Sequence, residues 1–461
     1  MMKDNKLKTP SSGKPLRILT TLLLVFILAL VAVAGVGAFL LFEMENPVIT
    51  LQKEIKYLGR QSEIPFSATD QKSGLRSVVV TVVQNGQEQE LLTQNFDRQG
   101  WFSEAGPAQT KSKALFDLGK TKLKEGPAEI VITVRDFSLT GGFQGNSTVQ
   151  RLAVAVDTKA PQIGLQHSQR YIRPGGSGIV VYDLSEPATM HGAMVDDLFF
   201  QGFPLKGKEN RYIAYIALPW DSEGVRSSRV VAKDQAGNEG TAVFTMVFKD
   251  VPDKSDGINV SDGFLNTKIP EFQEHYPEMT GSLVDKYLFV NNEVRNRNAA
   301  TIKELCSKPV AEQLWQDRFA RMLGQTMAGY AEQRTYFYQD KEIDHQVHLG
   351  IDIASTTNSE VKAANRGKVV FADYLGIYGN MVLIDHGQGV FSLYSHLSRI
   401  ETTAGADVDQ NTVIAYSGTT GMAGGDHLHF SMLIHGMFVT PIEWWDQHWI
   451  DVNIKEIISQ L

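Results

Sequence analysis

The feature that most restricts how this chain folds is an uncharged apolar run at residues 18–42, close to the N-terminus. As a helix it reaches about 37 Å, at about 1.5 Å per residue, enough to cross the roughly 30 Å hydrocarbon core of a bilayer. Basic residues dominate residues 1–17, and acidic Glu43 and Glu45 follow the run. Because the basic side of a membrane span stays in the cytoplasm, the run predicts a single-pass transmembrane anchor that sends the rest of the chain outside.

A cleaved signal peptide is the alternative interpretation of this run, because the stretch VAVAG offers small residues suited to a cleavage site. The run is long for the apolar segment of a signal peptide, which favours a retained anchor. Both interpretations export the same domains. We therefore expect a short cytoplasmic tail at residues 1–17, a location at the cytoplasmic membrane, and C-terminal domains in the periplasm or at the cell exterior.

Composition narrows the classes of function open to the exported part. The net charge of −8 is spread without long acidic runs, so nucleic-acid binding has no electrostatic support. The single cysteine, Cys306, excludes an internal disulfide framework and a cysteine-rich zinc site. Cys306 lies in a segment with the pattern of an amphipathic helix, where we expect it to be buried by packing.

Residues 47–250 have the pattern of β-structure. In residues 75–92 a β-branched run, the turn dipeptide Asn85-Gly86 and a second run together predict a hairpin. Similar runs recur along the segment, at a spacing close to the length of an immunoglobulin-like sandwich. The segment therefore predicts two such β-sandwich modules, which serve as spacers or as binding surfaces for envelope proteins.

Residues 251–325 are predicted to be a linker that contains helices. A polar, turn-rich stretch opens the segment, and helical spacing follows in residues 284–306 and again in residues 311–323. In the second stretch an apolar stripe predicts one helical face that packs against a neighbour, formed by Leu314, Trp315, Phe319, Met322 and Leu323. A helical segment at this place is also a candidate cover for a groove in the residues that follow.

The C-terminal part, residues 326–445, carries the candidate chemistry. It combines short β-strand patterns with many glycines, and most of the chain's 11 histidines lie there. Alternate residues of a strand face the same side, so the two histidines of HLH can both reach one cleft. Three stretches supply a candidate metal site: HQVHLGIDIAS with His348 and Asp352, LYSHLS with His396, and GGDHLHFSM with His427 and His429.

These five side chains exceed what one metal ion needs. A catalytic zinc site takes three protein ligands and keeps one position for water. Two groups then remain to handle protons or developing charge near that water. Spacing alone does not assign the individual histidines. Imidazole and carboxylate donors favour zinc, although manganese, nickel and copper accept the same residue types.

The stretches HLGIDIA, GNMVLIDHGQGVFSLYSHLS and SGTTGMAGGDHLHF resemble the lysostaphin-type (LytM) zinc metallopeptidases, which cleave peptide bridges in bacterial peptidoglycan. The resemblance implies that Zn²⁺ is held by His348 and Asp352, from an HxxxD motif, and by His429, the second histidine of an HxH motif. It implies that His396 and His427 flank the zinc-bound water as general base and transition-state stabiliser. The implied fold is a small open antiparallel β-core that forms a groove over the metal.

The same resemblance bears on several neighbouring residues. Asp426 stands where the family commonly has proline, just before the HxH motif. Tyr336 and Tyr338 are both candidates for a tyrosine that polarises the substrate. His345 lacks the HLGID context of the motif histidine, and His386 is expected to pack or to form hydrogen bonds.

The sequence as a whole predicts a mainly β protein with one N-terminal transmembrane helix. The predicted function is that of a membrane-anchored, zinc-dependent endopeptidase that hydrolyses peptide cross-links of peptidoglycan. The alternative is a non-catalytic LytM-type regulator or scaffold that activates other cell-wall hydrolases. Expected partners are peptidoglycan peptide stems, the inner membrane and envelope proteins that bind the β modules, but no nucleic acid. The expected order is a tail at 1–17, the anchor at 18–42, β-sandwich modules at 47–157 and 158–250, a helical linker at 251–325, the open β-core peptidase domain at 326–445 and a C-terminal tail at 446–461.

Overall fold

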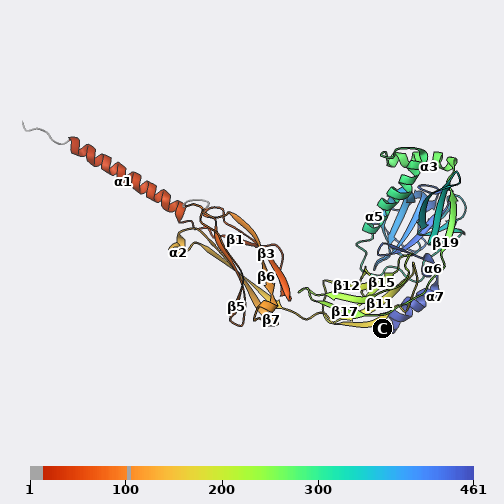
Figure 1. The fold of residues 1–461 in the computed structure, drawn as a ribbon, viewed down its shortest axis with the longest axis horizontal. Coiled ribbons are helices and arrows are strands. Elements are labelled where there is room, and N and C mark those ends of the chain that lie inside the picture. The colour runs from red at the N-terminus through yellow and green to blue at the C-terminus, as the bar shows by residue number, and fades with distance from the viewer. Residues whose placement is uncertain (1–13, 101–104) are drawn as a thin grey trace, which may run out of the picture. The chain divides into compact units, whose positions relative to one another are not determined.

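The computed structural model describes residues 14–100 and 105–461, which form two compact units (Figure 1). The first unit ends at residue 159 and also includes residues 235–238. The second unit holds residues 160–234 and 239–461. Most of the basic tail expected at residues 1–17 lies outside the described residues.

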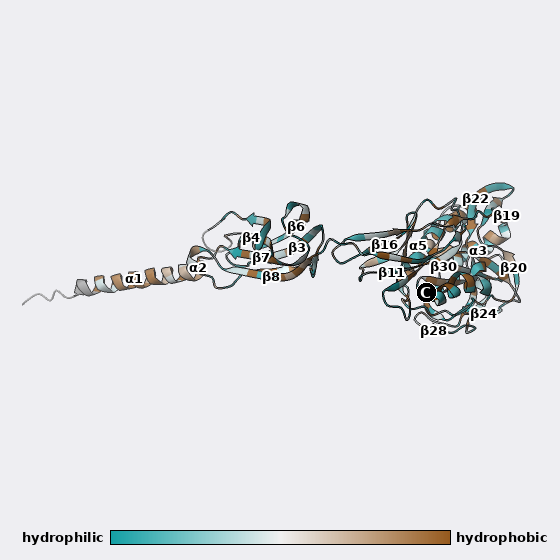
Figure 2. Cartoon of the chain, turned by 90° about the horizontal axis from the view of Figure 1, so that it is seen from below, coloured by the Kyte–Doolittle hydropathy of each residue, from teal (hydrophilic) through white to brown (hydrophobic). Residues whose placement is uncertain are grey.

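Helix α1, Lys14–Leu41, opens the first unit. Its stretch Ile18–Phe39 is the one helix, among the residues that the structure describes, that is long and apolar enough to cross a membrane. None of that stretch is buried within the protein, and Figure 2 shows the helix as hydrophobic along most of its length. The apolar helix predicted at the N-terminus is confirmed, while its insertion in a membrane stays a proposal.

The rest of the first unit is a two-sheet β structure. Phe66 and Phe116 of one sheet share a buried core with Val80 and Ile132 of the other. The predicted hairpin is present, and Asn85 and Gly86 have φ of 51° and 78°, as the twist of a two-residue hairpin loop requires. One sheet contains β1 (Val48–Leu51), β3 (Gln61–Thr69) and β6 (Gln109–Asp117), and the other contains β2 (Tyr57–Leu58), β4 (Leu75–Gln84), β5 (Gln87–Asn95), β7 (Gly126–Asp136) and β8 (Ser147–Val156). Short helical turns lie at η1 (Leu118–Lys120) and α2 (Thr140–Phe143).

The second unit begins with another pair of four-stranded sheets. The first sheet contains β9 (Ile163–Ser168), β11 (Ser177–Leu184), β14 (Phe203–Pro204) and β15 (Arg211–Ala217). The second contains β12 (Met190–Val195), β13 (Leu198–Gln201), β16 (Ser228–Lys233) and β17 (Glu239–Val243). A short parallel pair joins β10 (Tyr171–Ile172) to β18 (Val247–Phe248).

A large antiparallel sheet forms the C-terminal part of the second unit. Its main path contains β20 (Gln325–Ala328), β23 (Ile351–Ala354), β30 (Leu428–Ile434), β27 (Val390–Ile400), β26 (Asn380–Asp385), β25 (Gly367–Tyr374) and β28 (Asp407–Val408). Strands β24 (Glu360–Lys362), β29 (Val413–Ser417) and β31 (Met437–Val439) pair off this path, and the turn η3 (Gly376–Tyr378) precedes β26. The expected β-rich C-terminal part is confirmed.

Helices cover one side of this sheet. They comprise α3 (Asp262–His275), α4 (Leu283–Phe289), η2 (Val290–Val294) and α5 (Arg295–Leu305), and Figure 1 shows α3 and α5 beside the strands. Their apolar side chains, such as Phe272 and Val294, share a buried cluster with Leu393 and Leu433 of the sheet. Cys306 is buried in this cluster, as predicted, and burial raises the pKa of its thiol.

The helix predicted at residues 311–323 is wrong. That stretch is irregular, and its backbone bonds to distant residues: the amide of Phe319 donates to the carbonyl of Trp444, and that of Ala320 to the carbonyl of Ala364. Trp315 is buried as expected, but Leu323 is 86% exposed. Trp315 and Phe319 both pack against the ring of Trp444, so contacts with distant residues replaced local helix formation.

Two further features depart from the simple linker and tail of the sequence analysis. Residues of the polar stretch form strand β19 (Lys254–Asn259), which pairs in parallel with β21 (Glu332–Tyr338), and β21 pairs with β22 (Lys341–His348). The chain ends in helical turns at α6 (Pro441–Trp445), α7 (Gln447–Ile450), η4 (Asp451–Lys455) and α8 (Glu456–Gln460). Glu443 of α6 accepts hydrogen bonds from Arg173 and Ser177, which ties the C-terminal turns to the β9–β17 sheets.

Candidate metal centre and its groove

Strand pairing brings the HxxxD and HxH stretches together. Asp352 on β23 lies directly opposite His429 on β30. His348 is the last residue of β22, four residues before Asp352, and the chain turns between them at Gly350. A side chain on Gly350 would put its Cβ 2.5 Å from the His429 ring, so only glycine lets this turn pass so close to the imidazole.

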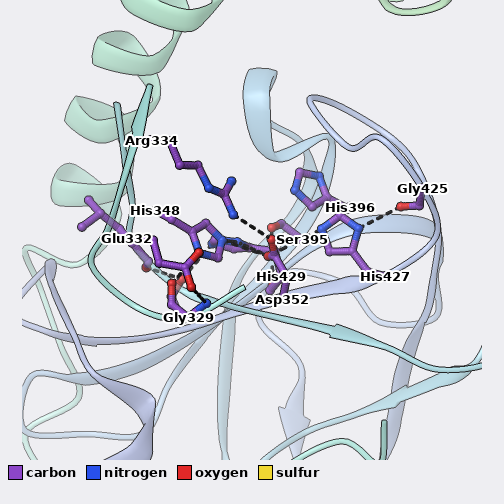
Figure 3. A network of polar contacts seen from close by, with 12 residues as sticks. Gly329, Glu332, Arg334, His348, Asp352, Ser395, His396, Gly425, His427 and His429 are labelled. Atoms are coloured by element: carbon purple, nitrogen blue, oxygen red, sulfur yellow. Dashed lines mark hydrogen bonds and ion pairs between the residues drawn. The ribbon is translucent and has the colours of Figure 1, made fainter. Parts of the chain in front are cut away.

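His348, Asp352 and His429 form a triangle of close polar atoms (Figure 3). The Nε2 atom of His348 lies 2.9 Å from Oδ1 of Asp352 and 2.9 Å from Nδ1 of His429. The third side, from His429 Nδ1 to Asp352 Oδ1, is also 2.9 Å. All three side chains are largely buried.

The neighbouring hydrogen bonds indicate which ring nitrogens are unprotonated. His348 donates from Nδ1 to the carbonyl of Gly329 at 2.7 Å, which leaves a lone pair on Nε2. Ser431 uses its hydroxyl proton on the carbonyl of Leu349, so it accepts at 3.1 Å from Nε2 of His429. The lone pair of His429 is then on Nδ1. Two nitrogen lone pairs and one carboxylate oxygen therefore converge on a single point.

This donor set fits a divalent cation. Three converging lone pairs repel one another unless a proton or a metal ion lies between them. A tetrahedral ion at about 2.0–2.1 Å from each donor would hold its ligand atoms about 3.3–3.4 Å apart, close to the observed 2.9 Å. The backbone carbonyl and serine hydroxyl behind the two imidazoles are the supports that histidine ligands commonly have. The cluster can hold a metal ion, and two imidazoles with one carboxylate suit zinc.

His396 and His427 lie on the far side of the triangle from His348 (Figure 3). His427 donates from Nδ1 to the carbonyl of Gly425, and its Nε2 lies 3.5 Å from Oδ1 of Asp352. His396 donates from Nδ1 to the carbonyl of Thr420 at 2.9 Å, and its ring centroid lies 4.9 Å from that of His427. In both rings Nε2 is therefore the atom that gains or loses a proton.

His396 adopts a backbone conformation that is rare for histidine. Its φ is +62° within β27, where a non-glycine residue is strained. The hydrogen bond to Thr420 and the burial of the side chain hold it there. Strain of this kind gathers at functional sites, and here it turns the imidazole toward the cluster.

Burial and the shared carboxylate set the charges in the cluster. Burial raises the pKa of the Asp352 carboxyl, but the adjacent imidazoles of His348, His427 and His429 outweigh burial and hold this pKa well below its usual range. Burial lowers the pKa of His429 to about 4, and burial together with the neighbouring imidazoles lowers the pKa of His396 well below its usual range. Burial also lowers the pKa of His427, but the hydrogen bond and charge of Asp352 dominate and raise it.

Arg334 is a member of the site that the sequence analysis missed. Its Nη2 lies 3.3 Å from Oδ2 of Asp352, the carboxylate oxygen that the histidines do not contact. Its Nε is buried and has no hydrogen-bond partner among the described residues. Arg334 lies on β21 opposite Gln346 of β22, so strand pairing rather than a local motif brings it to the site.

A groove of about 1090 Å³ opens over the cluster. The sheet forms its floor, and the helical segment supplies a wall that includes Tyr287 and Arg295. Trp220, from the loop after β15, also lines it. The helical segment predicted as a candidate cover thus borders the groove.

The structure separates the tyrosines near the site. Tyr336 lines the groove, whereas Tyr338 does not line it and donates to Asp262 from its hydroxyl at 2.9 Å. Tyr378, which the sequence analysis did not name, also lines the groove, and its ring centroid lies 6.0 Å from that of His429. Tyr378 is the last residue of η3, and a Cβ on the next residue, Gly379, would lie 2.4 Å from the backbone of Thr420, so the turn fits only with glycine.

The remaining residues named from the sequence lie outside the triangle. His345 is exposed at the groove edge, where its ring contacts Glu342 and Thr335. His386 is fully buried and bonds through both ring nitrogens, as expected for a packing residue. Asp426 accepts from the hydroxyl of Ser417 and from the amide of Asn358, and so fixes the loop before HLH without proline.

Comparison with known protein families agrees with this geometry. The model of peptidase family M23 matches residues 346–441, the stretch that holds the triangle and both flanking histidines. Residues 346–441 form an M23 peptidase domain. The LytM-type resemblance stated from the motifs is therefore confirmed for this part of the chain.

Relatives of the M23 domain include enzymes and a regulator. The chain is 39% identical over 97 residues to the DD-carboxypeptidase/endopeptidase Mpg of Neisseria meningitidis, a match that covers 21% of this chain and 22% of that protein. It is 35% identical over 96 residues to the peptidoglycan DD-endopeptidase ShyA of Vibrio cholerae, covering 21% and 22%. It is also 35% identical over 95 residues to the murein hydrolase activator EnvC of Escherichia coli, covering 21% and 23%. The match thus spans about a fifth of each of these relatives.

Proposed function

We propose that this chain is a zinc-dependent endopeptidase that hydrolyses peptide cross-links of peptidoglycan outside the cytoplasmic membrane. The convergence of His348, Asp352 and His429 at 2.9 Å, with two further histidines beside them in an open groove, carries the proposal. The M23 relatives named as peptidoglycan endopeptidases support the reaction and the substrate class. Helix α1 would hold the enzyme at the membrane, and the β-sandwich modules would act as spacers or bind envelope proteins.

In this proposal His348, Asp352 and His429 hold Zn²⁺, which supplies Lewis acidity and a nucleophile at neutral pH. His396, whose Nε2 is unprotonated and whose pKa is lowered, is the group we assign to accept a proton from the attacking water and to pass it to the leaving amine. His427, whose pKa is raised by Asp352, is assigned to donate a hydrogen bond that stabilises charge developing on the carbonyl oxygen. The carbonyls of Thr420 and Gly425 orient these two rings by accepting their Nδ1 protons.

Mass spectrometry of the fragments released from purified peptidoglycan tests the proposal. The full chain in detergent should release cross-link fragments with zinc and none with a chelator. His429→Ala and Asp352→Ala should bind less zinc and release no fragments. His345→Ala is the matched control, because His345 borders the same groove outside the triangle, and it should retain zinc and activity. Full release by both ligand variants, or none by the zinc-loaded wild type, would contradict the proposal.

A second candidate function is that of a non-catalytic activator of other cell-wall hydrolases. The similarity to the murein hydrolase activator EnvC favours it. The retention of the metal triangle and both flanking histidines favours the enzyme instead. An activator would release no fragments by itself but would raise the rate of an added wall hydrolase, and His429→Ala would leave that stimulation unchanged.

A further inference from the structure

The groove carries more positive charge than an acidic protein of net charge −8 leads one to expect. Of the described side chains that line it, Asp352 alone is a carboxylate, and it belongs to the metal triangle. Two guanidinium groups, of Arg295 and Arg334, line the same groove. A bound divalent ion would add further positive charge. The groove is therefore suited to an anionic ligand.

The two arginines differ in what they contact. Arg334 is engaged with Asp352, at 3.3 Å. Arg295 has no carboxylate within ion-pair distance among the described residues, although most arginines nearby, such as Arg297, have one. An arginine in a cleft without an acidic partner leaves its charge available to a ligand.

Arg295 is held in place by one residue of η2, the helical turn that directly precedes α5. Its Nε donates to the carbonyl of Asn291 at 3.0 Å, and its Nη2 donates to Oδ1 of the same residue at 2.6 Å. Asn291 is fully buried and is fixed in turn by its own donation to Asp344 at 2.8 Å. These bonds involve Nε and Nη2 and leave Nη1 without a hydrogen bond to a described residue, on a side chain that lines the groove. A guanidinium that is already held in place loses little entropy when it binds an anion.

Arg295 also lies close to the metal triangle. Helix α5, which begins with Arg295, packs against η3, which ends with Tyr378, and both residues line the groove. Tyr378 in turn lies with its ring against that of His429. If the scissile bond of a peptide substrate lies over the metal triangle, a substrate group bound at Arg295 is therefore only a few substrate residues away from that bond.

We propose that Arg295 binds a carboxylate of the peptide substrate and thereby selects peptides that carry a free carboxylate near the scissile bond. This inference rests on the proposed peptidase function. The carboxylate is either the C-terminal group of a peptide stem or the side-chain group of an acidic stem residue. Arg295 bonds one of its oxygens through Nη1, and the positive charge of the groove favours the ionised form.

Matched substrates test this assignment. A cross-linked muropeptide dimer is prepared in three forms: with all carboxylates free, with the C-terminal group amidated, and with the side-chain groups amidated. The wild-type chain, in detergent with zinc, should show a KM about ten- to a hundredfold lower for the free form than for one of the amidated forms, as expected for a charge-assisted hydrogen bond. The amidated form that shows the higher KM identifies which carboxylate Arg295 binds.

Arg295→Gln should raise KM for the free form to the value of that amidated form and leave kcat unchanged. Arg297→Gln is the control, because Arg297 lies two residues further along the same helix and pairs with Glu278 and Glu293 outside the groove. It should behave as the wild type on every substrate. Arg295→Lys keeps the charge without the fork and should recover part of the discrimination, which separates recognition from a general loss of folding.

Two results would overturn the inference. One is an equal KM of the wild type for all three forms, and the other is a loss of kcat in Arg295→Gln that is the same on every form. Binding of the uncleaved dimers to chelator-treated protein, measured by calorimetry, keeps the test independent of turnover. If the zinc-loaded chain cleaves none of the dimers, the proposed function fails. A preference for the free form in calorimetry that Arg295→Gln abolishes would then still support the carboxylate site.

Discussion

Arg334 Nη2 lies 3.3 Å from Oδ2 of Asp352, while Oδ1 of the same carboxylate contacts His348 and His429 at 2.9 Å. The two oxygens thus have separate roles: one joins the imidazoles, and the other is held by the guanidinium. The contact fixes the rotation of the carboxylate about its Cβ–Cγ bond. It makes Arg334 a positioning residue for the candidate metal ligand.

Arg334→Gln should therefore weaken zinc binding. Loss of a group that orients a metal ligand typically costs about ten- to a hundredfold in affinity. We expect a rise of that size in the dissociation constant for zinc, measured by competition with a chromogenic chelator. Gln333→Ala, on the neighbouring position of β21, is the control and should leave zinc affinity unchanged. Equal zinc affinity in wild type and Arg334→Gln would show that Asp352 needs no such support.

The helical segment should influence catalysis through the loop that orients His396. Glu271 of α3 accepts from the amide of Gly421 at 2.8 Å, and Lys268 donates to the carbonyl of Thr419. Between these contacts, the carbonyl of Thr420 accepts the Nδ1 proton of His396. Loss of the Glu271 contact frees this loop and misplaces the imidazole.

Glu271→Ala should lower kcat by about tenfold or more, because small misplacements of catalytic groups are costly, and should leave zinc content unchanged. Steady-state kinetics with a muropeptide substrate and elemental analysis of the protein measure the two quantities. Glu274→Ala, exposed on the same helix, should match the wild type. Deletion of the whole helical segment is a poorer test, because it uncovers Phe391 and Leu433 of the core. An unchanged kcat in Glu271→Ala would exclude this route of influence.

Local patterns in the sequence predicted much of this architecture. The β-branched runs around Asn85-Gly86 encode their hairpin within a few residues, and the periodicity of residues 284–306 encodes helices that the structure contains. The motif histidines and Asp352 were recognised by spacing and context, and the structure brings them together. Their roles as ligands and catalytic groups stay predictions.

Features that depend on distant partners were not predicted. Arg334 reaches Asp352 only because β21 and β22 pair in one register, and nothing near it in the sequence marks it as part of a site. Strand β19 lacks an apolar pattern and forms through pairing with β21, more than 70 residues later in the chain. Trp315 and Phe319 imitate helical spacing, yet both are buried against Trp444, a residue far along the chain. In each case the deciding interaction is non-local.

A buried carboxyl group should make the junction at α6 sensitive to pH. Burial raises the pKa of Glu443, despite the opposing charge of Arg173 and the hydrogen bonds from Ser177. A carboxyl whose pKa is higher in the folded state adds stability at pH values below its unfolded pKa, and this stability is lost as pH rises through the folded pKa. The neutral variant Glu443→Gln lacks that dependence.

The stability of Glu443→Gln relative to wild type should therefore increase as pH is raised from about 4 to about 7, across the range in which the carboxyl ionises. Urea unfolding followed by tryptophan fluorescence measures the free energy of unfolding of each variant. Trp444 is a suitable reporter because it donates a hydrogen bond to Ser177, which also contacts Glu443. Glu456→Gln, in the exposed C-terminal turn, should show no such trend. If the stability of Glu443→Gln relative to wild type instead decreased as pH rose, the ion pair with Arg173 would have a larger effect on the pKa of Glu443 than burial has.

Removal of metal should destabilise the M23 domain. Without a cation, the lone pairs of His348, Asp352 and His429 converge in a buried site with only protons to separate them. A metal ion that binds the folded state at a hundred times its dissociation constant adds about 2.7 kcal/mol of stability. We expect a chelator to lower the melting temperature of the wild type in a thermal scan, and added zinc to restore it. His348→Ala should melt at the lower temperature with or without chelator, whereas His345→Ala should respond as the wild type does. A wild-type melting temperature that ignores both chelator and zinc would mean that protons alone hold the three side chains together, and the metal would then have no part in the fold.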